Sequence, residues 1–200
     1  DVNAYYYIYQ TLETQAARYI LKKFLVFTLI PIFLVSCAER GSTYKNASGS
    51  GNERIIENVP FVKQKGFFCG PAAMASVMRF YGRDISQEEI AKAVYTPKLK
   101  GALISDMENY AREMGYKAET KNGDLNMLMS IIDEGVPAIT LVDIGKWIIT
   151  QPHYYVVYGY DKSRRVFFLH TGFAGDQEIN FSSLDKEWKK MDRLVLIIRK

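Results

Sequence analysis

The chain has 200 residues, of which 48% are hydrophobic and 24% charged, the composition of an ordinary globular protein with room for one domain and further segments. Its formal net charge of +4 is spread along the chain without a basic stripe, which argues against binding to nucleic acid. Two cysteines and two histidines cannot supply a four-ligand zinc site at a familiar spacing, and no GxxxxGK or GxGxxG motif supports a nucleotide site. We therefore expect no metal, no cofactor and no nucleotide partner.

Residues 1–36 have the pattern of a secretory signal. Lys22 and Lys23 precede about twelve apolar residues, 24–35, a run too short to span a bilayer core of about 30 Å. A basic stretch followed by a short apolar stretch is typical of a signal peptide. We expect the true start to lie near Leu21 and residues 1–36 to be absent from the mature protein.

The apolar run ends in the sequence Leu-Val-Ser-Cys at residues 34–37, which resembles the lipobox of bacterial lipoproteins. This resemblance implies that Cys37 is acylated, becomes the new N-terminus and holds the protein to a membrane of the bacterial cell envelope, facing outside the cytoplasm. Residues 37–54 are polar and rich in Gly and Ser, which predicts a lipid-anchored flexible tether with a reach of roughly 20 Å. With Cys37 acylated, Cys69 has no disulfide partner, and a lone exported thiol favours a catalytic role.

The most informative motif is the run QKGFFCGPAA at residues 64–73. Cys69 opens an apolar helix, and Pro71 suits the first turn of that helix. A cysteine on an apolar helix is by itself usually a small core residue. Here, however, the helix N-terminus would favour a thiolate, and the amide of Gln64 can donate to an oxyanion. His153, in a segment with strand periodicity, is the available base, so the combination indicates nucleophilic catalysis.

Periodicity and capping residues predict four helices before residue 135, after which strands dominate. Ser86 with Glu89 and Ser105 with Glu108 have the spacing of capping boxes. Helices first and strands later predict an α+β domain over residues 55–200. The expected helices are 70–81, 86–95, 105–114, 124–134 and 184–189, and the expected strands are 116–120, 137–142, 153–160, 165–170, 179–181 and 194–198.

Two stretches, QKGFFCGPAAMASVMRFYG and PHYYVVYGYDKSRRVFFLHTG, resemble the double-glycine (bacteriocin-processing-like) peptidases of the papain-like superfamily, and within them a lipoprotein subgroup. The resemblance implies a papain-like fold, in which N-terminal helices that carry the nucleophile pack on a C-terminal antiparallel sheet. It implies Cys69 as nucleophile, His153 as general base and Gln64 as oxyanion donor. The best-known relatives are fused to export transporters and cut leaders after two glycines. This chain has no transporter helices and no ATPase motif, so that specificity does not carry over.

The third catalytic position departs from the family pattern. Relatives place Asp or Asn at the end of the strand after the histidine strand, where this chain has His170. If residues 162–163 form a two-residue turn, His170 pairs with Tyr155 and shares a face with His153, about 7–8 Å away. We therefore expect His170 to fix the tautomer of His153, and Asp161 to act only as a turn former. A bulge that shifted this pairing by one residue would turn His170 to the other face.

Together these observations predict a lipid-anchored cysteine peptidase, which hydrolyses a peptide bond in an exported peptide or protein through a Cys–His thiolate and an acyl-enzyme. Two alternatives stay open. The same thiol, base and oxyanion donor serve other acyl transfers, such as those of an amidase or a transpeptidase. A non-catalytic lipoprotein would use the groove only to bind peptide, and fast reaction of Cys69 with a thiol probe would argue against it.

Overall fold

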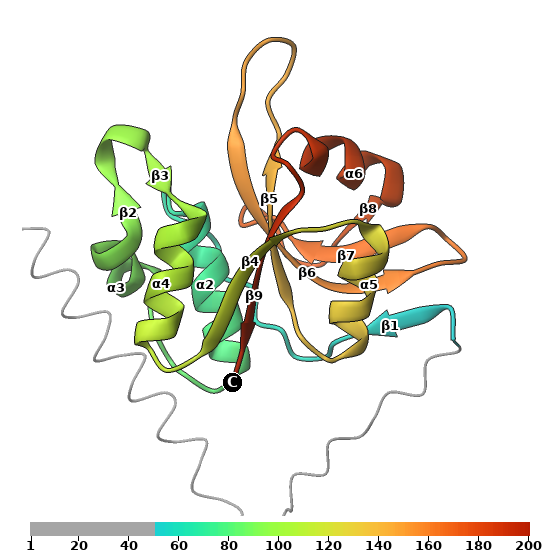
Figure 1. Ribbon diagram of the computed structural model, residues 1–200, viewed down its shortest axis with the longest axis horizontal. Coiled ribbons are helices and arrows are strands. Elements are labelled where there is room, and N and C mark those ends of the chain that lie inside the picture. Colours follow the sequence, from blue (N-terminus) through green and yellow to red (C-terminus); the bar gives the residue numbers. More distant parts are fainter. Residues whose placement is uncertain (1–50) are drawn as a thin grey trace, which may run out of the picture. The chain divides into compact units, whose positions relative to one another are not determined.

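The structure is a computed structural model, and it describes residues 51–200. The expected signal segment, Cys37 and most of the expected tether lie outside the described residues, so those predictions stay predictions. The described residues belong to a single unit of helices and strands (Figure 1). Within this unit, no helix has the length and apolar character needed to cross a membrane.

The elements follow the predicted order. The helices are α2 (Cys69–Phe80), α3 (Gln87–Val94), the 3-10 helix η1 (Pro97–Leu99), α4 (Ile104–Glu113), α5 (Leu125–Asp133) and α6 (Phe181–Lys189). The strands are β1 (Glu53–Ile55), β2 (Tyr95–Thr96), β3 (Gly101–Ala102), β4 (Lys117–Asn122), β5 (Ala138–Asp143), β6 (Pro152–Asp161), β7 (Val166–His170), β8 (Gln177–Asn180) and β9 (Leu194–Arg199).

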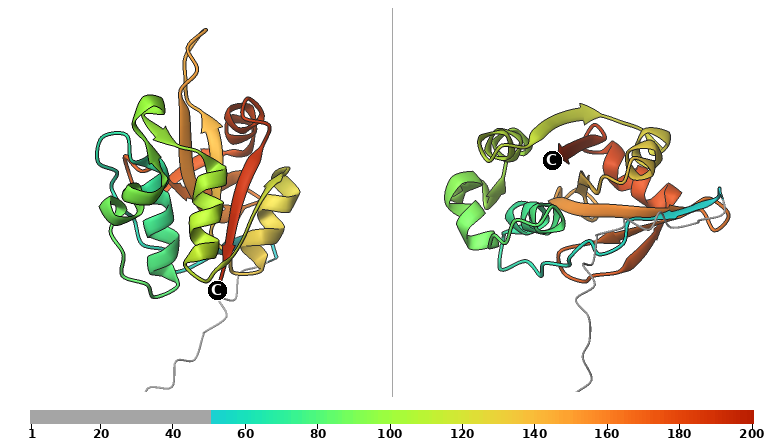
Figure 2. Two further views of the ribbon diagram at one scale, coloured as in Figure 1. Left: turned by 60° about the vertical axis from the view of Figure 1, so that its left-hand side comes forward. Right: turned by 90° about the horizontal axis from the view of Figure 1, so that it is seen from below.

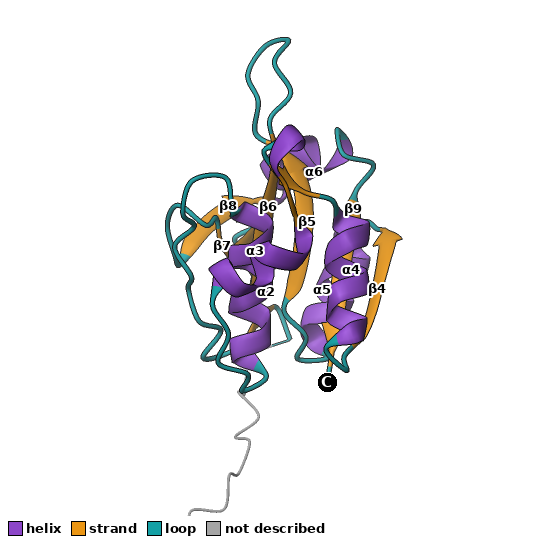
Figure 3. Ribbon diagram, turned by 90° about the vertical axis from the view of Figure 1, so that its left-hand side faces the viewer, coloured by secondary structure: helices purple, strands orange, loops and turns teal. Residues whose placement is uncertain are grey.

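Most strands join one antiparallel sheet built around the long strand β6. Its order is β4-β9-β5-β6-β7-β8, and β1 pairs with the end of β6 that β5 does not reach. Figure 2 shows this arrangement from two sides, and Figure 3 looks onto α2, α3 and α4 with strands of the sheet behind them. The strand that carries His153 is therefore held by neighbours on both edges.

Helices cover both faces of β6 near its first residues. The ring of Tyr154 lies against α2, because a Cβ added at Gly70 would come within 3.3 Å of it. The hydroxyl of Tyr155 donates to Glu187 of α6 at 3.2 Å. Adjacent side chains of a strand point to opposite faces, so α2 and α6 lie on opposite sides of β6. This packing fixes the N-terminus of α2 beside the start of β6.

The predicted helix caps are partly confirmed. Ser86 accepts a hydrogen bond from Glu89 N–H at 3.1 Å, and Asp124 caps α5 in the same way through Met127 N–H at 2.7 Å. The predicted cap at Ser105 is wrong, because α4 already begins at Ile104. The small β2–β3 hairpin, which the sequence pattern did not indicate, ends just before this helix and sets its start.

The turn between β6 and β7 is longer than predicted. Asp161 pairs with Val166, so four residues, 162–165, form the turn in place of two. Asp161 is the turn former that the sequence indicated, since its Oδ1 accepts hydrogen bonds from the N–H groups of Ser163 at 2.8 Å and Arg164 at 3.0 Å.

A bulge then changes the pairing along the same hairpin. The register shifts by one residue between residues 157 and 159, and His170 pairs with Val156. The predicted pair of His170 with Tyr155 is therefore wrong. A bulge places two residues of one strand opposite one of its partner, which reverses the faces beyond it. His170 thus shares a face with Val156, and His153 points to the other face of the sheet.

Candidate active site

Cys69 is the first residue of α2 and carries a free, partly buried thiol. Phe68, at the N-cap position, supplies no side-chain cap, so the N–H groups of the first turn stay available. The backbone N–H groups of Gly70, Tyr154 and Cys69 itself lie close enough to the thiol to lower its pKa. Because Tyr154 directly follows His153, the backbone at the start of the histidine strand reaches the thiol, while the side chain of His153 lies on the side of Tyr155, with ring centroids 5.5 Å apart.

Both members of the Cys–His pair are neutral at rest. Burial raises the pKa of the Cys69 thiol, and the surrounding N–H groups oppose this rise without cancelling it. The expected resting thiolate is therefore not found, because removal from water outweighs the helix N-terminus. Burial lowers the pKa of His153, against a smaller opposite effect of the Thr171 carbonyl.

The ring of His153 is oriented by a backbone group. Its Nε2 lies 2.5 Å from the carbonyl oxygen of Thr171, and Phe173 stacks on the ring with centroids 4.8 Å apart. A carbonyl can only accept, so Nε2 carries the hydrogen and Nδ1 carries the lone pair. In the described part of the chain, no hydrogen bond occupies Nδ1. It is the ring nitrogen that is left free to accept a proton.

Gln64 lies in the loop before Cys69 and contacts the end of β7. Its backbone N–H donates to the Gly172 carbonyl at 2.9 Å, and its Nε2 donates to the Gly66 carbonyl at 2.8 Å. Gly172 has a φ of +80°, and a Cβ there would lie 2.8 Å from the Oε1 of Gln64. The left-handed φ and this close contact both favour glycine at position 172. The amide nitrogen has a second hydrogen, which is the one an oxyanion would use.

The backbone on either side of Gln64 is held by Gln87, which the sequence analysis missed. Gln87 is the first residue of α3 and is 6% exposed. Its Nε2 donates to the Lys63 carbonyl and its Oε1 accepts from the Lys65 N–H, each at 2.9 Å. We call this pair of bonds the Gln87 clasp. It makes Gln87 a positioning residue for Gln64.

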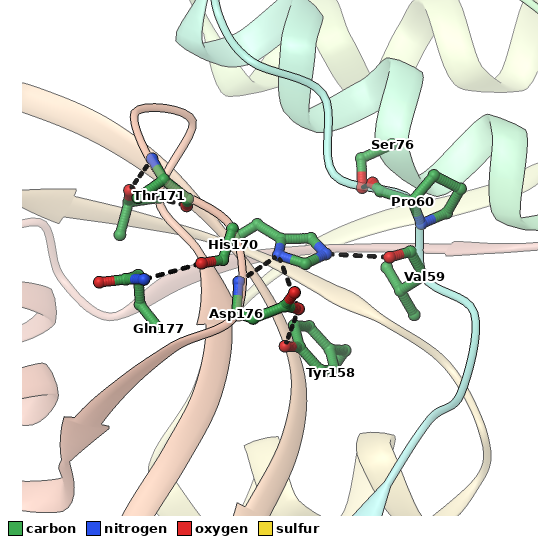
Figure 4. A network of polar contacts seen from close by, with 10 residues as sticks. Val59, Pro60, Ser76, Tyr158, His170, Thr171, Asp176 and Gln177 are labelled. Carbon is green, nitrogen blue, oxygen red and sulfur yellow. Dashed lines mark hydrogen bonds and ion pairs between the residues drawn. The ribbon is translucent and has the colours of Figure 1, made fainter.

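The imidazole of His170 belongs to a separate network, drawn in Figure 4. Its Nε2 lies 2.9 Å from the Val59 carbonyl, and its Nδ1 accepts from the Asp176 N–H at 3.1 Å. The hydroxyl of Tyr158 donates to the Asp176 carboxylate at 2.8 Å. Both ring nitrogens are therefore used, and the predicted hydrogen bond between His170 and His153 is not formed. The Thr171 carbonyl, one residue further along, stands in that place.

A small cavity lies beside the thiol. A cavity of about 10 Å³ between α2 and β6 is lined by Cys69, Ser76 and His170, among others, and is no larger than a water needs. Across residues 51–200, no group of three or more His, Cys, Asp or Glu could hold a metal ion.

Several groups of this site could not be read from the sequence. The carbonyl of Thr171 and the N–H of Tyr154 are backbone atoms and have no residue-type signature. Gln87 looked like an ordinary residue of a capped helix, and Phe173 lies outside every predicted helix and strand. The only available signal was spacing: Thr171 and Phe173 follow the predicted β6–β7 hairpin closely.

The model of the Peptidase C39-like family matches residues 56–195. This chain belongs to the Peptidase C39-like family. The match contains every candidate residue of the site except Cys37. A comparison with curated proteins gave no match.

Solved structures of C39-like peptidases have the same fold. The peptidase domain of Streptococcus ComA, a bifunctional ABC transporter, is 22% identical with a TM-score of 0.56, over 73% of this chain and 97% of that one. A putative C39-like peptidase from Bacillus anthracis is 16% identical with a TM-score of 0.61, over 74% and 98%. A double-glycine-motif protease from an AMS/PCAT transporter, solved with its leader peptide, is 18% identical with a TM-score of 0.58, over 74% and 97%. The predicted α+β, papain-like fold is confirmed.

Proposed function

We propose that this protein is a lipid-anchored cysteine peptidase that cleaves an exported peptide or protein outside the cytoplasm. The observation that carries the proposal is the meeting of the Cys69 thiol with the start of the histidine strand, where the Thr171 carbonyl holds Nε2 of His153. Family membership supports the same activity. The leader peptide bound to the AMS/PCAT protease supports a peptide as substrate.

Acylation begins from the neutral pair. The thiol proton of Cys69 passes to Nδ1 of His153 as sulfur bonds to the carbonyl carbon of the scissile peptide. The carbonyl oxygen becomes an oxyanion, and the backbone N–H of Cys69 and the Nε2–H of Gln64 donate to it. The imidazolium then gives its proton to the leaving amine. The C–N bond breaks, and a thioester on Cys69 remains.

Deacylation reverses these roles. A water gives one proton to Nδ1 of His153 while its oxygen bonds to the thioester carbon, and the same donors hold the second oxyanion. The C–S bond breaks, the sulfur takes the proton back, and the carboxylic acid product leaves. Throughout, the Thr171 carbonyl keeps the ring in one tautomer but supplies no full negative charge to the imidazolium.

The cellular substrate is found by comparing strains that carry the native gene or Cys69→Ala. We expect uncut precursors among the exported proteins of the Cys69→Ala strain, and new N-termini at the same sites in the native strain. A non-catalytic binding module would be favoured by two results together. The two strains would have identical sets of N-termini, and native Cys69 would not react fast with a thiol probe when exported peptides are present.

Membrane attachment through Cys37 is tested separately. Native protein should partition into detergent and carry acyl chains, whereas Cys37→Ala should not. Continued acylation of the Cys37→Ala protein would contradict the lipid anchor and leave the peptidase proposal intact.

A further inference from the structure

The loop between β5 and β6 projects away from the other described elements (Figures 1 and 3). Its end carries Trp147, Ile148 and Ile149, which are 100%, 98% and 70% exposed. We call these three residues the apolar tip. Other large apolar side chains on the surface of residues 51–200 are at most 57% exposed. Contiguous exposed apolar residues are costly in water and mark interaction sites.

The base of this loop is built to hold the apolar tip outward. Asp143 Oδ1 accepts hydrogen bonds from the N–H groups of Gly145 and Gln151, both at 2.8 Å. Lys190 of the segment after α6 lies 3.3 Å from the other oxygen of Asp143. Trp147 has a φ of +61°, a left-handed conformation that is uncommon for a bulky residue and makes the turn. The exposure is thus a feature of an ordered loop.

We propose that the apolar tip inserts into an anionic lipid surface. Three side chains on a narrow loop cannot bury the roughly 800 Å² per partner of a stable protein interface, whereas a bilayer accepts so small a wedge. Tryptophan favours the membrane interface, and aliphatic side chains favour the layer beneath it.

The charges around the apolar tip fit the same partner. Lys146 adjoins the tip, and residues 144–151 contain no acidic side chain. Lys189 and Lys190, both exposed, lie at the end of α6, and Lys190 contacts the base of the loop. Two carboxylates lie near the base of the loop: Asp143 is paired with Lys190, and Glu187 of α6 accepts a hydrogen bond from Tyr155. Lysines at this position attract anionic headgroups.

Insertion would direct the candidate active site toward the bilayer, since the loop leads straight into β6 and His153. Substrates would then be peptide segments at the membrane surface. The inference does not rest on the proposed function, because Cys69→Ala should insert as well as the native chain does.

Tryptophan fluorescence of the full chain tests the proposal. The chain has two tryptophans, and Trp188 is fully buried, so the difference between the native chain and Trp147→Phe reports Trp147 alone. The probe is vesicles of phosphatidylethanolamine and phosphatidylglycerol with brominated acyl chains, compared with phosphatidylcholine vesicles. We expect Trp147 emission to move to shorter wavelength and to be quenched by the bromine, more strongly in the anionic vesicles.

Variants make the result specific. Ile148→Ser with Ile149→Ser should shift the equilibrium at least about tenfold toward exposed Trp147, whereas Leu99→Ser, a matched exposed residue elsewhere, should leave it unchanged. Trp147 that stays open to aqueous iodide in both kinds of vesicle overturns the proposal. The proposal is also overturned if Trp147 becomes shielded from iodide in the absence of vesicles as the protein concentration rises, because the apolar tip would then bind a second copy of the chain.

Discussion

The two histidines of this chain are equally buried and make similar contacts at Nε2, but among residues 51–200 only one of them has a hydrogen-bond partner at Nδ1. His153 and His170 lie on neighbouring strands, each is 3% exposed, and the Nε2 of each lies against a backbone carbonyl. They differ at Nδ1, which accepts from the Asp176 N–H in His170. In His153, no bond within the described residues occupies it. Burial and the contact at Nε2 are therefore the same for the two rings, and only the partner of Nδ1 distinguishes them.

The largest expected effect is a difference in kcat between two matched variants, His153→Gln and His170→Gln. In each variant the glutamine keeps an amide donor near the backbone carbonyl. His153→Gln should lower kcat by about 100- to 10,000-fold, because the proton acceptor is lost. His170→Gln should change kcat of the folded enzyme little. Turnover of a cleaved peptide, corrected for the folded fraction by circular dichroism, measures both. Equal losses in the two variants would break the comparison.

The next effect concerns the oxyanion. Gln64→Ala should reduce kcat by about 100- to 1,000-fold through loss of one donor, while the reaction of Cys69 with iodoacetamide stays native. Steady-state kinetics measure the loss of kcat, and the rate of alkylation by iodoacetamide shows whether Cys69 keeps its native reactivity. As a control, Lys65→Ala changes a neighbouring exposed side chain without touching the donor. If Gln64→Ala lowered the thermal midpoint and left kcat unchanged, Gln64 would have a structural role and no role at the oxyanion.

His170 should instead govern stability. His170→Ala leaves the Val59 carbonyl and the Asp176 N–H without their partner, and each buried group left unsatisfied costs about 1–3 kcal/mol of unfolding free energy. Urea denaturation measures the loss, and Asp161→Ala, at the far turn, is a comparison on the same hairpin. A variant as stable as native but inactive would return His170 to the catalytic site.

The smallest effect is a shift in pH dependence. Burial lowers the pKa of His153, so the acid limb of kcat/KM should lie below the ordinary value of about pH 6.5. Phe173→Ala removes the ring stacked on His153 and should raise the pKa of His153 toward that value. More of the base is then protonated in weak acid, so activity at pH 6 should fall by up to about fourfold, with none lost at pH 8. A pH–rate profile of both proteins measures this, and an acid limb that does not move would mean that Phe173 does not shield the ring.

The fold and the position of Cys69 at the start of a helix were predictable from the sequence because local chemistry specifies them. The helix that begins at Cys69 and the cap at Ser86 are set by residues close in the chain. The role of His170 was not predictable, because it depends on where a bulge falls in β6. The alternation of apolar residues looks the same with the bulge as without it, yet one extra residue exchanges the two faces.

The Gln87 clasp also has a consequence for regulation. Its two hydrogen bonds come from the first turn of α3, and helix ends open locally far more often than whole domains unfold. Fraying of that single turn would release the loop of Gln64 while leaving Cys69 and His153 in place. Hydrogen exchange at the start of α3 would then track turnover. A ligand that stabilised this turn would act as an activator, and one that unwound it as an inhibitor, without either contacting the thiol.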